Sequence, residues 1–397
     1  MINLRSLFAF ALIAAALAVA HADPAPTPTT VTIPVSSPAF VFSPGNWTGD
    51  KGRGGDQFRQ TWYSGAYFRV TWTGNAKHIR LLIDTSGYGD AVKVKPHIAY
   101  CMDGHWGADV ECKDAIDIPG SPYTDAHWLA VYLQNSQQAD RWGAVGASGL
   151  NILKVTGLEL DSDAKLLSNK PASQWILEVG DSITEGSGTT GNLDDYSYFI
   201  GQAMQTVGYE YCVSACGWSG WLQYGDRPKD VPPYYFVAGS ANGVGGKYDT
   251  LQSRWDKIDG NGHSLLDAKG HISGYGDLGQ EPSMILINYG TNDAFWGSNV
   301  SDLQASIYQA LETLRAAAPA AKIYVIVPFE QFSADSIKGA VKRYQTVHDH
   351  DKAVRLIDLG TTPATMLRGE GFYGAVHPNM RGHAAFAAQL LVSILGK

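Results

Sequence analysis

The pattern of apolar segments changes near residue 170, and this change constrains the fold more than any other feature. Up to that point, short runs rich in β-branched and aromatic residues are separated by Gly, Asn and Asp turns, a pattern typical of strands. These runs are 66–72, 78–84, 92–101 and 128–134. Because no long amphipathic helix intervenes, the sequence predicts a β-sandwich or jelly roll over residues 31–167.

From Trp175 onward, strand-like runs alternate with helical segments. Predicted strands at 323–328 and 354–359 lie among predicted helices at 301–317 and 336–348. Such alternation is typical of a parallel sheet covered by helices, so the fold class over 175–397 is α/β, in three layers. Residues 168–174, Ser-Asn-Lys-Pro-Ala-Ser-Gln, are the predicted linker.

The first 22 residues have the features of a secretory signal peptide. Arg5 supplies positive charge, residues 7–20 are apolar, and Ala20-His21-Ala22 fits a cleavage site. Residues 23–30 are rich in Pro and Thr and are predicted to form a flexible leader. No later run is apolar for the roughly 20 residues that a membrane span needs. We therefore expect a protein exported to the periplasm or beyond, with no membrane span.

A serine follows the first predicted strand of the α/β part. The segment Val179-Gly180-Asp181-Ser182 comes directly after the apolar run that begins at Trp175, and a glycine-rich turn follows it. This arrangement exposes a hydroxyl at the carboxyl edge of the sheet, where a nucleophile is useful. Ser182 is therefore the candidate nucleophile.

Three later segments supply possible partners. They are Ser219-Gly220-Trp221, Gly290-Thr291-Asn292-Asp293 and Val376-His377-Pro378-Asn379. Attack of Ser182 on an ester makes an oxyanion, which needs fixed donors. The candidates are the backbone N–H groups of Ser182 and Gly220 and the side chain of Asn292, with His377 as general base and acid. Alternatively, Gly220 is an ordinary turn residue and Asn292 only caps a helix.

With its Ser, Gly, Asn and His blocks in this order, the chain resembles the SGNH (GDSL-type) hydrolase family. The family usually has an Asp three residues before the histidine, but this position is Gly374 here. Either a main-chain carbonyl orients His377, giving a Ser–His dyad, or another acid does so. Glu370 and Asp358 are the nearest candidates in sequence.

A β jelly roll followed by an SGNH domain is similar to carbohydrate esterase family 2. This resemblance implies an exported serine esterase that removes acetyl groups from polysaccharides or oligosaccharides, without a cofactor. Two alternatives are an O-acyltransferase that uses the same acyl-enzyme and a carbohydrate-binding protein with a vestigial site. The net charge of −8 argues against a nucleic acid partner.

A long insert with many aromatic residues, about 222–282, separates the glycine and asparagine blocks. A loop of this length is usually functional, so we expect it to form one wall of a substrate cleft. The other expected wall residues are Trp218, Trp221, Phe295 and Trp296. The alternative is that the insert packs on itself at the surface.

The four cysteines are Cys101, Cys112, Cys212 and Cys216. Export permits disulfides, and Cys101 and Cys112 flank a polar loop, which predicts a disulfide across a hairpin. Cys212 and Cys216 can pair only where the chain turns sharply by Gly217, because four strand residues span about 13 Å. No set of cysteines and histidines has the spacing of a metal site, so none is expected.

Overall fold

The protein is described here from a computed structural model. The structure describes residues 29–51, 54–88, 95–123, 125–135, 152–223, 232–235, 253–260, 262–274, 279–369 and 372–396. The predicted signal peptide lies outside the described residues, as does the predicted leader up to residue 28.

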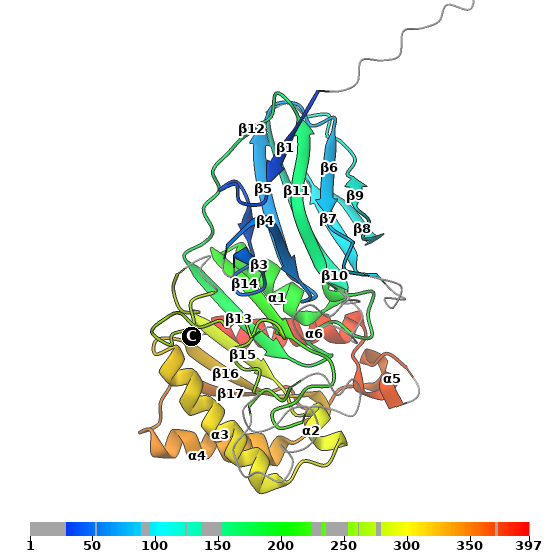
Figure 1. The fold of residues 1–397 in the computed structure, drawn as a ribbon. Helices are drawn as coiled ribbons and strands as arrows, with labels where there is room; N and C mark the ends of the chain where they lie inside the picture. The colour runs from blue at the N-terminus through cyan, green and yellow to red at the C-terminus, as the bar shows by residue number, and fades with distance from the viewer. Residues whose placement is uncertain are drawn as a thin grey trace, which may run out of the picture.

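The N-terminal part is a sandwich of two antiparallel sheets (Figure 1). In the first sheet, the hydrogen-bonded neighbours are, in order, β3, β4, β11, β6 and β9, and β1 also pairs with β11. In the second, β12-β5-β10-β7-β8 follow one another and β2 pairs with β5. The strands of the first sheet are β1 (Thr30–Pro34), β3 (Thr48–Lys51), β4 (Gly54–Thr61), β6 (Ile79–Ile83), β9 (Ala115–Asp117) and β11 (Leu153–Asp161). Those of the second are β2 (Val41–Phe42), β5 (Tyr67–Thr73), β7 (His97–Met102), β8 (His105–Glu111), β10 (Ala126–Asn135) and β12 (Lys165–Leu166).

The C-terminal part is built on a parallel sheet in the order β14-β13-β15-β16-β17. Its strands are β13 (Gln174–Gly180), β14 (Tyr209–Ala215), β15 (Met284–Asn288), β16 (Lys322–Val327) and β17 (Val354–Asp358). The helices are α1 (Tyr196–Gln205), α2 (Thr291–Phe295), α3 (Val300–Ala317), α4 (Ala334–Val347), α5 (Phe372–Val376) and α6 (Met380–Leu395). Single 3-10 turns are η1 (Asn192–Asp194), η3 (Phe329–Gln331) and η4 (Ala364–Met366). The predicted α/β class with a preceding β-sandwich is confirmed.

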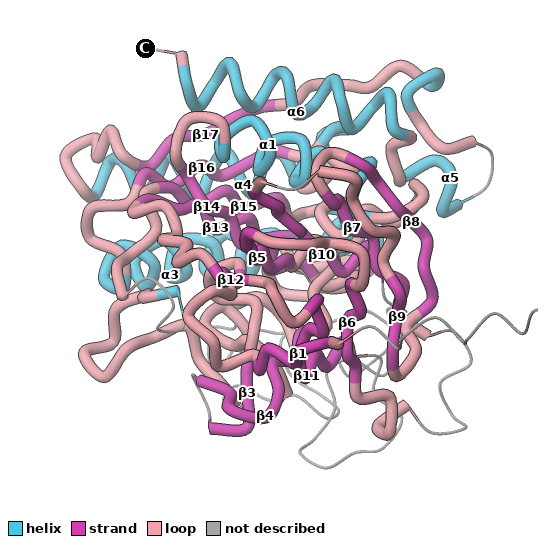
Figure 2. Tube along the Cα trace, turned by 90° about the horizontal axis from the view of Figure 1, so that it is seen from above, coloured by secondary structure: helices cyan, strands magenta, loops and turns pink. Residues whose placement is uncertain are grey.

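Helices cover both faces of the parallel sheet (Figure 2). Strand side chains alternate between the faces, so Leu177 and Val179 pack in the core that α3 and α4 share. Ile176 packs on the other face, in the core that α1 and α6 share. Because both faces are buried, the central strands β15 and β16 are almost continuously apolar rather than alternating, as is typical of parallel sheets.

The β-sandwich is joined to the α/β part by buried polar contacts. Glu210, on the edge strand β14, accepts hydrogen bonds from the Tyr67 hydroxyl and the Arg69 guanidinium. The Trp62 indole donates to the carbonyl of Ile258 at 2.9 Å, and Asn46 donates to the carbonyl of Val213 at 3.0 Å. These buried donors and acceptors lose their water partners when the two parts pack, so they hold a specific relative orientation.

The structure contradicts the predicted Cys101–Cys112 disulfide, because both residues are free thiols. Cys101 pairs with Trp106 in the hairpin, whereas the N–H of Cys112 bonds to the carbonyl of Pro96. The five residue steps from position 96 to position 101 span about 16 Å of strand, beyond the roughly 7 Å limit for a disulfide. Cys212 and Cys216 are buried and form no disulfide with each other, because β14 runs straight from Cys212 to Ala215.

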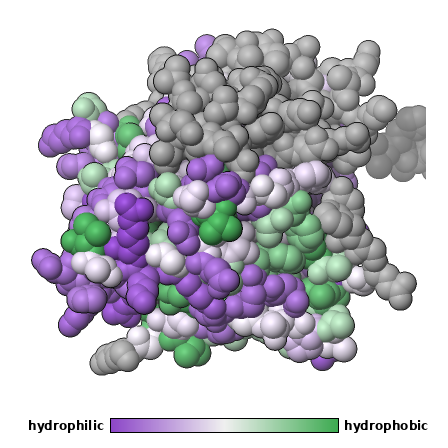
Figure 3. Space-filling model, turned by 90° about the horizontal axis from the view of Figure 1, so that it is seen from below, coloured by the Kyte–Doolittle hydropathy of each residue, from purple (hydrophilic) through white to green (hydrophobic). Residues whose placement is uncertain are grey.

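No helix among the described residues is long and apolar enough to cross a bilayer. Among the described residues on the face seen from below, hydrophilic side chains are interspersed with groups of apolar ones (Figure 3).

Candidate active site

Ser182 and His377 meet at the carboxyl edge of the parallel sheet. Ser182 follows the end of β13 by two residues, and His377 lies between α5 and α6. Their side chains are in hydrogen-bond contact, with 2.9 Å between His377 Nε2 and Ser182 Oγ. This is the contact that a general base needs to take the hydroxyl proton.

Asn292 lies beside the Ser182 turn, in the first turn of α2. Its Nδ2 donates to the carbonyl of Ser219 at 2.9 Å and to Asp181 Oδ2 at 3.4 Å. Gly290 is the N-cap of this helix, so Asn292 is not the capping residue. The side chain therefore joins the serine, glycine and asparagine blocks.

Gly220 is needed because a carboxylate occupies the space next to its Cα. A Cβ at residue 220 would lie 2.5 Å from Asp293 Oδ2. The buried Asp293 carboxylate accepts the N–H groups of Trp221, Leu222 and Gln223 at 2.9 to 3.1 Å. The N–H of Gly220 donates to the carbonyl of Gln223 at 2.8 Å. Sequence reasoning missed Asp293, whose position in the Gly-Thr-Asn-Asp block was the available signal.

Arg254 is a second residue that sequence reasoning missed. It is fully buried, and its Nη2 donates to the carbonyls of Gly180 and Ser214, both at 3.2 Å, and to the Tyr289 hydroxyl. These acceptors lie at the ends of β13 and β14 and just after β15, so one guanidinium bonds to all three strand ends that lead into the site. It lies in the insert between the glycine and asparagine blocks, so it belongs to none of the four sequence blocks.

Burial raises the pKa of Asp181 to about 7, with Asp293 acting in the same direction and Arg254 in the opposite one. Asp181 Oδ1 accepts the N–H of Ile183 at 3.0 Å, which fixes the turn that carries Ser182. Glu185 links the same turn to the glycine block, because its Oε2 accepts the N–H of Gly217 at 3.0 Å.

The structure explains the glycine at position 374. A Cβ there would lie 2.6 Å from the carbonyl oxygen of Gly369, so no acidic side chain fits. Asp358 is bound elsewhere, to Lys338 at 2.7 Å and to Gln331 at 2.5 Å. It ends β17, three strands and about 14 Å from β13, so it lies away from the strand that leads to Ser182. Glu370 lies outside the described residues.

The predicted cleft residues divide into two groups. Trp218 and Trp296 lie with ring centroids 6.5 Å apart, and Trp296 is 38% exposed. Phe295 is half-buried against Phe332. Trp221 is fully buried between Tyr234 and Tyr289, so its assignment to the cleft wall is wrong.

The aromatic residues in the described parts of the insert pack inward. Tyr234 is buried, and Tyr235 and Trp255 pack against the same core. The other aromatic residues named for the insert, Tyr224, Phe236, Tyr248 and Tyr275, lie outside the described residues.

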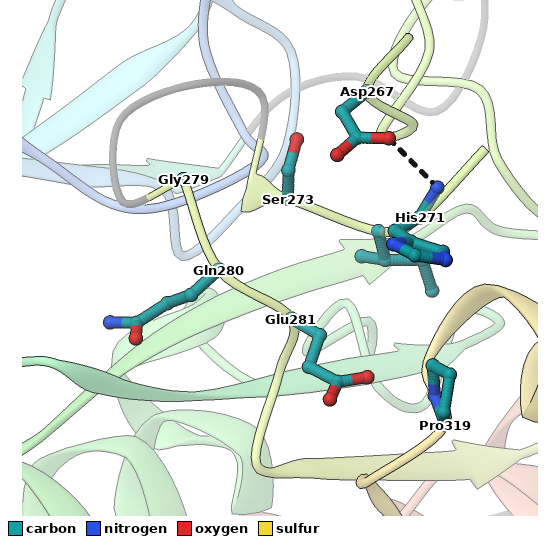
Figure 4. A pocket seen from close by; sticks show the side chains of 8 residues that line it. Asp267, His271, Ser273, Gly279, Gln280, Glu281 and Pro319 are labelled. Carbon is teal, nitrogen blue, oxygen red and sulfur yellow. Dashed lines mark hydrogen bonds between the residues drawn. The ribbon is translucent and has the colours of Figure 1, made fainter. Parts of the chain in front are cut away.

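A cavity of about 290 Å³ lies in the part of the insert before β15, and Figure 4 shows its lining. Its lining includes Asp267, His271, Gln280 and Glu281. The carbonyl of Gln280 accepts the indole N–H of Trp175, at the amino end of β13. The cavity is therefore at the opposite edge of the sheet from the Ser182–His377 contact.

The family and fold comparisons agree with this arrangement. Residues 179–385 match the family model described as GDSL-like Lipase/Acylhydrolase family. No curated protein sequence matches the chain significantly.

Three solved structures resemble nearly the whole chain, and at their low identities the likeness establishes the fold. A family two carbohydrate esterase from Clostridium thermocellum in complex with cellohexaose is 15% identical, with a TM-score of 0.61 over 90% of this chain and 99% of that one. An acetyl xylan esterase from Butyrivibrio proteoclasticus is 17% identical, with a TM-score of 0.64 over 93% and 99%. A salicylyl-acyltransferase from a tetracycline biosynthetic pathway is 14% identical, with a TM-score of 0.60 over 92% and 98%.

The matched residues include all four blocks and more than half of the chain. The chain belongs to the GDSL-like lipase/acylhydrolase family and is a carboxylic ester hydrolase.

Proposed function

We propose that this protein is an exported serine esterase that removes acetyl or other short acyl groups from a polysaccharide or oligosaccharide. The observation that carries the proposal is the 2.9 Å contact between Ser182 Oγ and His377 Nε2. His377 Nε2 takes the proton of Ser182 as Oγ attacks the ester carbonyl, then gives it to the departing sugar oxygen. The same imidazole then deprotonates water, which attacks the acyl carbon, and the imidazolium returns this proton to Ser182 Oγ as the acid leaves.

The tetrahedral oxyanion needs donors at the end of the sheet. We assign this role to the backbone N–H of Ser182 and to Asn292 Nδ2, whose second hydrogen makes only a long contact of 3.4 Å with Asp181 Oδ2 and can turn to the oxyanion. The N–H of Gly220 joins them when its hydrogen bond to Gln223 opens, because catalytic hydrogen bonds often form fully only with substrate bound.

A sugar substrate is supported by the aromatic side chains close to Asn292 and Gly220. Trp218 and the exposed Trp296 offer flat faces on which a sugar ring can stack. Two esterases that share the fold act on or bind such polymers, one as an acetyl xylan esterase and one bound to cellohexaose.

Acyl transfer to an acceptor alcohol is the second candidate, and the acyltransferase that shares the fold favours keeping it. The same Ser182 acyl-enzyme serves both reactions, and only the acceptor differs. The vestigial-site alternative is less well supported, because the serine and histidine are in contact.

The test is acetate release from acetylated xylo-, manno- and cello-oligosaccharides by wild type, Ser182→Ala and the exposed control Ser301→Ala. We expect Ser182→Ala to lose at least about 10³-fold in kcat and Ser301→Ala to keep wild-type activity. Adding an unacetylated acceptor sugar distinguishes hydrolysis from transfer, since transfer yields an acetylated acceptor. Serine-independent release would contradict the proposal.

A further inference from the structure

The β-sandwich reaches the loop that follows the candidate nucleophile. Gln134, near the end of β10, is 3% exposed, and its Nε2 donates to the carbonyl of Thr190 at 3.1 Å. Its Oε1 accepts the N–H of Asp109 in β8 at 2.6 Å. The amide is therefore held at one end by the sandwich and holds the loop at the other.

Two irregularities in the second sheet place this amide. The register between β10 and β7 shifts between Leu133 and Asn135, where Gln134 stands. The register between β7 and β8 shifts between Ile98 and Tyr100, beside Asp109, whose φ is +58°. Such bulges bend a strand and redirect its side chains, and they are frequent beside active sites.

On its other side, the same loop lies against His377. A Cβ on Gly188, whose φ is +101°, would lie 2.8 Å from the Cβ of His377. A Cβ on Gly191, whose φ is +133°, would lie 2.8 Å from the carbonyl oxygen of Gln134. Backbone alone therefore fills the space at both ends of the loop. The N–H of Ser187 also donates to the carbonyl of Ser182 at 2.9 Å, so the loop contacts both reacting residues.

We propose that Gln134 is a positioning residue for the esterase reaction and that the β-sandwich is thereby part of the catalytic apparatus. The inference rests on the proposed function, since it assumes that His377 serves Ser182. Gln134 fixes the loop at Thr190, and the loop limits where the His377 imidazole can lie. A displacement of about 1 Å in such a group can cost about 10²-fold in rate.

Two substitutions test the proposal. Gln134→Leu removes both hydrogen bonds at similar volume. Gln134→Glu keeps the acceptor for Asp109 but replaces the donor to Thr190 with a carboxylate oxygen. Gln60→Leu, at a half-buried position of β4, is the matched control. The readouts are kcat and KM on an acetylated xylo-oligosaccharide and on 4-nitrophenyl acetate, with thermal unfolding to verify folding.

We expect both Gln134 variants to lose about 10- to 10²-fold in kcat on the sugar acetate, with KM within about twofold. The loss on 4-nitrophenyl acetate should be smaller, because nitrophenolate leaves without a proton from His377, whereas a sugar alkoxide needs one. This difference between substrates is not expected of a variant that only weakens the fold. Gln60→Leu should match wild type on both substrates.

Wild-type kcat in Gln134→Glu, or equal losses on both substrates, would overturn the inference. Should Gln134→Leu fail to fold, Gln134→Glu decides alone, because it preserves the side-chain volume and the bond to Asp109. Failure of the proposed function is a separate result, since wild-type protein would then show no Ser182-dependent ester hydrolysis.

Discussion

The carboxylate of Asp293 occupies the position that a Cβ at residue 220 would take, with Oδ2 2.5 Å from that point. The glycine in one block and the acid in the next therefore depend on each other. The two blocks are far apart in the sequence, since the hydrogen-bonded residues Ser219 and Asn292 are 73 positions apart. The carboxylate also holds the backbone of residues 221–223 in place, because it accepts a hydrogen bond from each of their N–H groups.

Asp293→Asn is therefore expected to disturb the glycine block. An amide has one acceptor oxygen instead of two and sets an NH₂ group against backbone donors. We expect a fall of about 10²-fold in kcat and a loss of about 1–3 kcal/mol in the free energy of unfolding. Asp335→Asn, at an exposed position in the first turn of α4, is the control. Steady-state kinetics and urea unfolding measure the two effects, and unchanged kcat would show that Asp293 is not needed for the loop.

Asn292→Ala should remove an oxyanion donor. We expect kcat to fall by about 10² to 10³ while KM changes little, because the interaction forms mainly in the transition state. Asn299→Ala is a useful comparison, since Asn299 caps α3 through Ser301 and Asp302. It should cost about 1 kcal/mol of stability but leave kcat unchanged. A smaller fall in kcat for Asn292→Ala than for Asn299→Ala would contradict the assignment.

Glu178 is expected to make the folded protein less stable as the pH rises. It is buried on β13, and neither carboxyl oxygen has a hydrogen-bond partner among the described residues. Burial, together with nearby Asp195, raises the pKa of Glu178 well above its ordinary value. The fold therefore keeps the proton that the unfolded chain releases above about pH 4.3. Stability from this group is complete below that pH and is lost as the pH rises toward the folded value.

Glu178→Gln tests this linkage. The neutral amide should remove a slope of up to about 1.4 kcal/mol per pH unit in the free energy of unfolding above pH 4.3. Urea unfolding from pH 5 to 8 measures the slope, with Glu281→Gln as the control at a half-buried position. Identical slopes in wild type and Glu178→Gln would mean that the folded protein holds Glu178 ionised.

The cysteines should all be free thiols. The geometry of the β7–β8 hairpin keeps Cys101 and Cys112 apart, so the denatured protein should react as four thiols with a disulfide-exchange reagent. A reductant should leave the unfolding temperature unchanged. A count of two thiols would show that a disulfide forms and that the hairpin register differs.

Much of the fold could be predicted from the sequence, because strands, helices and turns each leave a pattern in a short stretch of residues. Runs rich in β-branched and aromatic residues, separated by turn residues, indicated the sandwich, and strand-like runs alternating with helical segments indicated the parallel sheet. Parallel strands bring their carboxyl ends to one edge, so the residues after β13, β14 and β15 had to meet there. That is why Ser182, Gly220 and Asn292 were predictable as neighbours, and the block order added His377.

Tertiary structure decided what depends on packing between distant segments. The register of the β7–β8 hairpin separates Cys101 from Cys112, and the spacing of the two cysteines in the sequence does not give that register. The aromatic character of Trp221 was visible, but only the packing of Tyr234 and Tyr289 determined that it is buried. Arg254 and Gln134 belong to no motif and reach the site across the insert and the sandwich. A sequence pattern indicates the local secondary structure and the apolar face of an element. Contacts such as those of Arg254 and Gln134 depend instead on how separate elements pack together.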